Sequence, residues 1–478
     1  MKKIQAIVLG MALFMGLAAQ GQEVSPVDFM RYNPYQMKSN PATDLPYESA
    51  MSLVIGNIDV DFQNSSFRYD NFFEFDEQGQ PATLNLRQFA NSLKKNNYLA
   101  LNLNVDLFTL YRRTKHGMLT FNYGVKAQAD AKCNDGLFKL LAYGNSAFVG
   151  EDNPAVVNMS VNAQVYQELA VGYQINVNKN LSLGFRPRLL SGFGDIRTDA
   201  FDAKLYTDAD SYALRVDEDI AMRASMPSVI ILKDGALATN GSFSIKDFFQ
   251  NPGFAIDLAA EYHFTPKISL VAAVHDLGFI HWRGNNFQMN GKINDAGQFY
   301  DNGSFLYDGL EGDQLELVIS DENYREQFFD SLQQYFNTEI TPAERYNAMM
   351  NTNVLLRGNI DITPCNRISA QVQGRFLGSG FRPALTLAYC GSFFNNLNVC
   401  ATYTVMPGSY DNIGFGLSWM IATCNIYLTT NNVIGCFKPL NAGGMNAQVG
   451  IVFNLWVPER RYVKQPKNSE PEPEEELE

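Results

Sequence analysis

The sequence predicts an all-β protein, a transmembrane antiparallel β-barrel of about fourteen strands with long, partly helical extracellular loops. Three observations predict this fold: repeated alternation of apolar and polar residues, an amino terminus typical of a secretory signal, and connections that are alternately short and long. The clearest alternation runs through residues 97–111, turns at 114–117 and resumes through 118–130. A side-chain period of two indicates a strand with one apolar face and one polar face.

Residues 1–21 are interpreted as a signal peptide, because Lys2 and Lys3 precede an apolar stretch that ends in small residues. A retained membrane anchor is the alternative, although the apolar stretch is short for one. The rest of the chain has no apolar run of about eighteen residues, so a closed barrel is the structure expected to cross the bilayer. A formal net charge of −13 disfavours nucleic acid as a partner. We therefore expect export to the cell outer membrane, with outer-membrane lipid around the barrel.

The alternation defines fourteen candidate strands, an even number. They are residues 51–62, 97–111, 118–130, 160–176, 181–192, 253–263, 268–278, 353–361, 367–377, 383–391, 396–404, 412–419, 424–430 and 446–456. Every second connection is short, and the four longest of the others fall near 63–96, 131–159, 193–252 and 279–352. Short turns at one end and long loops at the other are typical of outer-membrane barrels.

Each strand has one apolar row that we expect to face lipid, as in Leu183 with Phe185 and in Leu385 with Leu387. The opposite rows carry charges, which are costly on the lipid side and suit a lumen. The candidates for contact with a solute in the lumen are Arg186, Arg188, Arg357, Arg375, Asp257, Glu261 and His275. The alternative is that the acidic side chains simply pair with the arginines and make the wall rigid.

Aromatic residues near strand ends are candidates for the girdles at the two membrane interfaces: Tyr111, Tyr262, Tyr403 and Trp419. In the long loops, residues 135–149 predict a short helix and residues 201–224 predict a hairpin that extends the wall. An aromatic stripe at 321–336 has helical spacing, and Thr341, Pro342 and Glu344 predict the start of a further helix.

The predicted organisation has four parts. Residues 1–21 are the signal peptide, and residues 22–50 form an amino-terminal segment that is either a tether or a lumenal plug. Residues 51–457 form the barrel, and residues 458–478 are predicted to be a disordered acidic tail in the periplasm.

Three segments resemble an uncharacterised family of Bacteroidetes outer-membrane barrels: residues 181–192, 275–284 and 362–370. That family is similar to FadL-type channels and to the PorV-like barrels of type IX secretion. Asn40, Pro41 and Ala42 resemble the Asn-Pro-Ala element near the start of such barrels. The resemblance implies that the amino-terminal segment folds into the lumen as a hatch. The continuation at 43–46 departs from the glycine-rich pattern expected of a FadL channel.

Six cysteines in an exported chain raise the question of disulfides. Cys390 and Cys400 lie in inward rows of successive strands at similar distances from the turn, so they can either form a cross-strand disulfide or remain two buried thiols. The spacing of the cysteines and the four histidines matches no metal motif, and no catalytic motif occurs. We expect no enzyme activity, no metal and no cofactor.

Two functional hypotheses follow. The first is a FadL-like channel that takes up a small hydrophobic or amphipathic solute. The second is a non-transporting barrel that scaffolds a surface or secretion complex with other outer-membrane or periplasmic proteins. A packed lumen without a continuous path argues against transport, whereas an open hatch or a gap between strands argues against a pure scaffold.

Overall fold

The structure is a computed structural model that describes residues 24–45, 51–75, 81–226, 230–233, 236–239, 249–291, 338–378, 380–394, 396–407, 409–437 and 443–455, and single positions between 308 and 327. The predicted signal peptide, most of the predicted aromatic stripe at 321–336 and the predicted tail at 458–478 lie outside the described residues.

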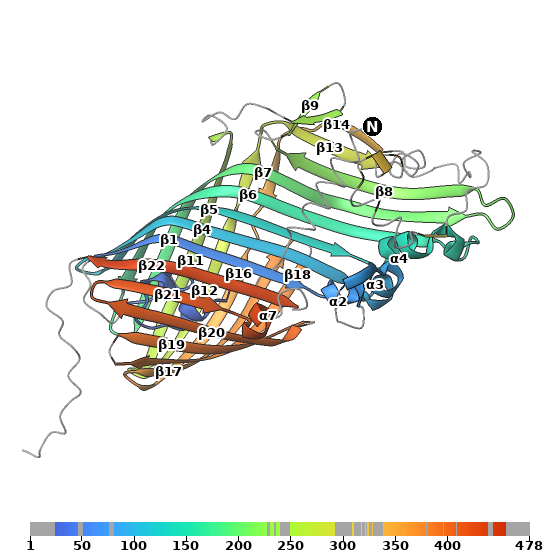
Figure 1. Cartoon of the computed structure of the whole chain (residues 1–478). Helices are drawn as coiled ribbons and strands as arrows, with labels where there is room; N and C mark the ends of the chain where they lie inside the picture. The colour runs from blue at the N-terminus through green and yellow to red at the C-terminus, as the bar shows by residue number, and fades with distance from the viewer. Residues whose placement is uncertain are drawn as a thin grey trace, which may run out of the picture.

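Fourteen antiparallel strands form a closed barrel (Figure 1). In ring order they are β1 (Met51–Asn64), β4 (Asn97–Arg113), β5 (Gly117–Cys133), β6 (Ala155–Asn176), β7 (Leu181–Thr207), β11 (Asn251–Thr265), β12 (Ile268–Trp282), β16 (Asn353–Thr363), β17 (Asn366–Leu377), β18 (Gly380–Phe393), β19 (Leu397–Met406), β20 (Ser409–Ile421), β21 (Cys424–Thr430) and β22 (Gly444–Leu455). Pairing of β22 with β1 closes the ring. Each of the fourteen predicted strands overlaps one of these, so the predicted fold class is confirmed.

The two faces of the wall have the predicted chemistry. Apolar side chains of the outward rows are exposed, among them Phe185 (46%), Leu258 (43%) and Leu387 (51%). Charged side chains of the opposite rows are buried, among them Arg188 (1%) and Asp257 (2%). The outer surface is therefore an apolar belt of the kind that lipid covers, around a polar interior.

Bulges change which side chains face the lumen. In β4 the pairing with β5 shifts between Asp106 and Phe108, so Leu107 and Phe108 are both exposed. One extra residue reverses the alternation beyond it, because successive side chains alternate between the two faces. Tyr111 is consequently 3% exposed, and its prediction as a girdle residue is wrong. Tyr262, Tyr403 and Trp419 are exposed, as predicted for an outward row.

Part of the wall continues beyond the ring at the end that carries the long connections (Figure 1). The upper part of β7 pairs with β8 (Leu214–Ser225), β8 pairs with β13 (Asn286–Gly291), and β13 pairs with β14 (Thr338–Pro342). The hairpin predicted at 201–224 is therefore confirmed. Its turn is held by Asp208, whose carboxylate accepts hydrogen bonds from the Ser211 amide and hydroxyl at 2.8 Å. These bonds lower the pKa of Asp208.

The helix predicted to start near Thr341, Pro342 and Glu344 is wrong. Thr341 and Pro342 end β14, and β15 (Tyr346–Met349) follows and pairs with β12. The edge of β13 offers backbone hydrogen-bonding groups that β14 satisfies, and a proline is tolerated at a strand end. Pairing with an existing sheet thus outweighs the local helix-start signal.

The remaining elements are short. They are η1 (Pro26–Phe29), η2 (Pro34–Lys38), α2 (Tyr69–Phe72), β2 (Phe73–Phe75), β3 (Pro81–Leu84), α3 (Leu86–Ser92), α4 (Gly136–Tyr143), η3 (Asn145–Phe148), β9 (Ile230–Lys233), β10 (Ala236–Thr239) and α7 (Val433–Phe437). The helix predicted within 135–149 is confirmed by α4. Around Phe89, α3 and α4 pack with α2 into an apolar cluster at the end of the long connections (Figure 1). Among the described helices, none has the length and apolarity needed to cross a membrane.

Candidate functional site: the occupied lumen

Residues 24–45, here called the lumenal segment, lie inside the barrel and contact its wall from several directions. The sequence shapes the segment into two short turns: Ser25 accepts a hydrogen bond from the Val27 amide and forms a capping box with Asp28, and Asn33 caps the second turn through the Tyr35 amide. Each cap is followed by a proline, whose fixed backbone torsion favours the first position of a turn. The segment is therefore a folded unit within the lumen.

The first half of the segment is held by apolar packing. Val27, Phe29 and Met30 are at most 1% exposed and belong to one cluster with inward side chains of the wall. The wall members of that cluster are Val54, Tyr111, Met118, Ala388, Cys390, Cys400, Tyr427 and Val452. At about 1.5–3 kcal/mol for each fully buried large apolar side chain, this packing anchors the segment.

The second half shares this apolar packing through Tyr35, Met37 and Leu45 and adds polar contacts. Lys38 forms an ion pair with Asp106 at 2.7 Å, and the Tyr35 hydroxyl donates to the same carboxylate at 2.7 Å. Asp106 is 1% exposed, so its charge depends on these partners. Near the end of the segment, Arg113 pairs with Asp44 at 3.0 Å.

The three predicted hatch residues contact the wall directly. The Asn40 amide donates to Glu261 at 2.8 Å, and Ala42 is fully buried in a cluster with Ala259 on β11. The backbone of Pro41 lies against Gly184 on β7, at a place where any Cβ would overlap the Pro41 carbonyl. Gly184 therefore creates the space that the segment occupies.

Arg186, Arg188 and Asp257 belong to one buried charge cluster, which also contains Lys126, Glu168 and Asp276. Arg188 is at its centre, with nitrogen–oxygen distances of 2.6 Å to Asp276, 2.8 Å to Glu168 and 3.0 Å to Asp257. Arg186 and Lys126 reach Glu168 at 3.1 and 3.2 Å. All six residues are at most 7% exposed, so this part of the wall is rigid and its charges are mutually compensated.

The sequence reasoning missed half of this cluster. Lys126 and Glu168 occupy inward positions of predicted strands, so a complete list of inward charges would have found them. Asp276 is different, because strict alternation puts it on the opposite face from His275. A bulge opposite Asp257 gives Asp276 a φ of 58° and turns both side chains inward.

Arg357, His275 and Glu261 bind the lumenal segment. Arg357 donates to the backbone oxygen of Asp28 at 2.7 Å, and its guanidinium lies 4.5 Å from the centre of the Phe29 ring. His275 Nε2 lies 3.0 Å from the Ser39 carbonyl oxygen. Of the seven predicted lumen residues, only Arg375 lies apart from the segment and the charge cluster, since it lines a cavity near the mouth.

One cavity in the described part of the structure lies beside the segment, and another lies near the mouth. The deeper one has about 100 Å³ and is lined by Lys38, Arg186 and His275, among others. The second has about 220 Å³ and lies where β17 and β19 end and where β4 and β18 begin. Gln373 lines both. The deeper cavity has room for a few water molecules, so in this state the lumenal segment occupies the space that a solute would need.

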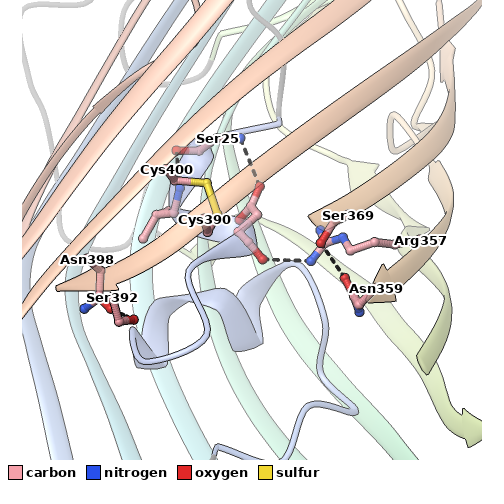
Figure 2. Close-up of a disulfide and its surroundings, with 10 residues drawn as sticks. Ser25, Arg357, Asn359, Ser369, Cys390, Ser392, Asn398 and Cys400 are labelled. Atoms are coloured by element: carbon pink, nitrogen blue, oxygen red, sulfur yellow. Dashed lines mark hydrogen bonds between the residues drawn. A yellow bond between two sulfur atoms is a disulfide. The ribbon is translucent and has the colours of Figure 1, made fainter. Parts of the chain in front are cut away.

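Cys390 and Cys400 are directly opposite one another in the pairing of β18 with β19, and the structure joins them in a disulfide (Figure 2). Cys400 is fully buried beneath the first turn of the lumenal segment. Cys365 and Cys436 are exposed thiols. Within the described residues, no three histidine, cysteine, aspartate or glutamate side chains are grouped to hold a metal ion.

Fold and lumen together define a closed fourteen-stranded β-barrel whose polar interior is occupied by its own amino-terminal segment. The chain belongs to the family of unknown function DUF5723, whose model matches residues 41–431. No curated protein sequence matches it.

Among solved structures, the chain is similar to the toluene transporter TodX of Pseudomonas putida, with 9% identity, a TM-score of 0.42 and coverage of 92% of this chain and 99% of that one. It is also similar to the toluene transporter TbuX of Ralstonia pickettii (9% identity, TM-score 0.41, coverage 88% and 92%). A third similar structure is a FadL homologue of Pseudomonas aeruginosa (12% identity, TM-score 0.39, coverage 91% and 97%).

Proposed function

We propose that this protein is an outer-membrane channel for a small hydrophobic or amphipathic solute, and that the lumenal segment is its gate. The observation that carries the proposal is that this segment fills the lumen through contacts of two kinds. Apolar side chains along its whole length pack against the wall, and Lys38, Asn40 and Asp44 add ion pairs and hydrogen bonds. The same proposal includes a signal peptide at residues 1–21, which directs export, and a periplasmic location for the tail at residues 458–478.

Polar attachment suits a part that must move. A buried ion pair gains little net free energy, because the attraction of the charges is offset by the loss of their hydration. Water that enters a polar lumen can replace such contacts, whereas it cannot replace apolar packing. Detachment of residues 38–45 therefore breaks contacts that water can replace together with the packing of Ala42 and Leu45, while the cluster around Phe29 keeps the first half bound to the wall.

The position of the cavities gives the expected route. A solute that enters at the mouth reaches Gln373, which lines both cavities, and then meets Lys38 and Ser39 of the lumenal segment. In the closed state the segment fills the lumen, which counts against free diffusion. Passage therefore requires residues 38–45 to leave the wall near Glu261 and Gly184.

A scaffold is the second candidate, and the outer wall is the observation that favours it. β8, β13 and β14 rise beyond the ring, and together with the cluster around Phe89 they offer a large surface at one end. Such a surface suits a protein partner whether or not the lumen opens.

Extraction of the protein from native membranes in mild detergent, followed by mass spectrometry of bound molecules, separates the two. A barrel recovered without stoichiometric protein partners and with a small amphipathic molecule supports the channel. A barrel recovered in a stable complex with other proteins, and with no current in planar bilayers at any voltage, contradicts the channel and supports the scaffold.

A further inference from the structure

One end of the barrel is positively charged along an arc of short turns. Three successive short connections of the ring, residues 114–116, 177–180 and 266–267, each contain an exposed lysine and no acidic residue. The lysines are Lys115, Lys179 and Lys267, and the exposed Arg112 stands at the end of β4 beside the first turn. These four side chains are here called the basic rim.

Hydrogen bonds between backbone groups join the turns of the basic rim. The Asn176 amide donates to the His116 carbonyl at 3.3 Å, which links the first turn to β6. The His263 amide donates to the Asn180 carbonyl at 2.7 Å, which links the second turn to β11. The lysines are therefore carried by neighbouring turns on one side of the ring rather than scattered around it.

The positive charge of the basic rim is not neutralised by the described part of the chain. Asp44 and Asp361 lie near the same end, but Asp44 pairs with Arg113 at 3.0 Å and Asp361 pairs with Arg367 at 2.7 Å. None of the four rim side chains takes part in an ion pair with another described residue. An arc of uncompensated cations attracts an anionic partner.

The last strand of the ring ends beside this rim. Leu455, the final residue of β22, is opposite Met51 of β1, and on the other edge of β1 Met51 is opposite Arg112. Since neighbouring strands lie about 4.8 Å apart, Leu455 is roughly 10 Å from the first cation of the rim. The residues that follow Leu455 therefore start within reach of the basic rim.

The sequence beyond β22 supplies the opposite charge. Six of the nine residues from Glu470 to Glu478, here called the acidic run, are glutamates. About fifteen residues connect Leu455 to Glu470, and that length spans roughly 20 Å as a flexible chain and about 45 Å when extended. Lys115 lies about three strand spacings, roughly 15 Å, from Leu455 around the ring. The acidic run can therefore reach the rim of its own barrel.

We propose that the acidic run docks on the basic rim of its own barrel, with its glutamates paired with Arg112, Lys115, Lys179 and Lys267. The chain between β22 and the rim then crosses the end of β1, so the docked run straps the seam at which β22 and β1 close the ring. This inference goes beyond the proposed channel function and holds whether or not the lumen opens. Because the rim side chains are exposed, the docking is expected to weaken with salt.

The test is zero-length cross-linking of the purified full chain in neutral detergent. A water-soluble carbodiimide condenses a lysine amine with a carboxylate that contacts it, and tryptic fragments are then identified by mass spectrometry. At low salt, the fragment that begins at Asn468 is expected to be joined to a rim lysine of the same molecule. Lys95 and Lys204, exposed lysines at the end with the long connections, are the matched controls and are expected to form no such cross-link.

Protection of the acidic run from a glutamyl endopeptidase gives an independent measurement. One exposed ion pair favours the docked form about 1.4- to 5-fold. The double variant Lys115→Gln, Lys179→Gln is therefore expected to be cut within the run about five-fold faster than the wild type at low salt, and equally fast at high salt. The double variant Lys95→Gln, Lys204→Gln is the control and is expected to be cut at the wild-type rate.

The proposal is overturned if the acidic run forms no cross-link to the rim, or if it is joined only to Lys464 and Lys467 of the tail or only to a second molecule. It is also overturned if the run is joined to Lys95 and Lys204 as often as to the rim, or if the two double variants are cut equally fast. Nanodiscs test the competing occupant, an anionic lipid headgroup. Loss of the rim cross-links when phosphatidylglycerol replaces phosphatidylcholine would assign the rim to lipid phosphates and overturn the tail as its occupant.

Discussion

Replacement of Gly184 by alanine tests whether the lumenal segment is a gate. A Cβ at this position would overlap the carbonyl group of Pro41 and lie 2.5 Å from the Ala42 nitrogen, whereas ordinary van der Waals contact begins at 3.4 Å. The neighbouring atoms are backbone and cannot rotate away. The segment or the strand must therefore move by about 1 Å, and overpacking of this kind costs about 1–3 kcal/mol.

That cost is paid only in the closed state, because a detached segment no longer contacts Gly184. A bias of about 1–3 kcal/mol raises the ratio of open to closed molecules roughly 5- to 150-fold. In planar bilayers, Gly184→Ala is expected to increase the fraction of time for which the channel conducts by a factor in that range. Limited proteolysis is expected to cleave residues 38–45 faster in the variant.

Gly358→Ala on β16 is the matched control, since a Cβ there meets no atom within 4 Å. It is expected to behave as the wild type in both assays. If Gly184→Ala conducts no more than wild type although its segment is cleaved faster, the segment moves but does not gate. If both variants conduct equally, the reasoning from the Pro41 contact is wrong.

Three further outcomes are expected. Lys38→Met leaves the buried Asp106 carboxylate without its ion-pair partner, which costs about 3–5 kcal/mol. Protease is therefore expected to cleave the lumenal segment faster in this variant than in a variant with a surface lysine removed. Gly192→Ala would place a Cβ 2.6 Å from a ring carbon of the fully buried Trp282. It is expected to lower the free energy of unfolding by about 1–3 kcal/mol, and thermal unfolding is therefore expected at a lower temperature. Cys365, an exposed thiol, is expected to react with a polar maleimide in the folded protein.

Each of these has its own control. Lys179→Met removes an exposed lysine and is expected to leave the proteolysis rate unchanged, and an equal effect of both lysine variants would contradict the role of the Asp106 pair. Gly358→Ala serves again for thermal unfolding, where a drop as large as that of Gly192→Ala would contradict the packing argument. Cys390 and Cys400 are expected to react only after reduction and unfolding, so labelling of the untreated protein at either would show that the disulfide is absent.

The barrel could be predicted from the sequence because its wall obeys one simple rule. Successive side chains such as Asp257 and Leu258 face the lumen and the lipid in turn, and the short turns continue this alternation from one strand to the next. The rule fails where a bulge adds a residue. This is why Tyr111 and Asp276 lie on unexpected faces, since neither bulge has a distinctive sequence signal.

The contents of the lumen were less predictable. Arg188 could be placed on the inward face, but its partner Asp276 comes from β12, 88 positions further along the chain. Alternation gives no information on which strands lie near one another around the ring. The contact of Pro41 with Gly184 is likewise a matter of three-dimensional packing. Alternation therefore predicts which side a residue faces, while the partner it meets there depends on how the ring closes.

The attachment of the lumenal segment has a consequence for the order of folding. Ser25 shares a hydrogen bond with Thr429, 404 positions further along the chain, and the apolar cluster of Val27 includes Tyr427 and Val452 from the last two strands. The first part of the described chain thus completes its packing only on the last strands to be synthesised. Closing so long a loop costs only logarithmically more entropy than closing a short one, but it cannot precede the arrival of those strands. Filling of the lumen and joining of β1 to β22 are therefore expected to be a single late event, so the barrel closes around its own contents.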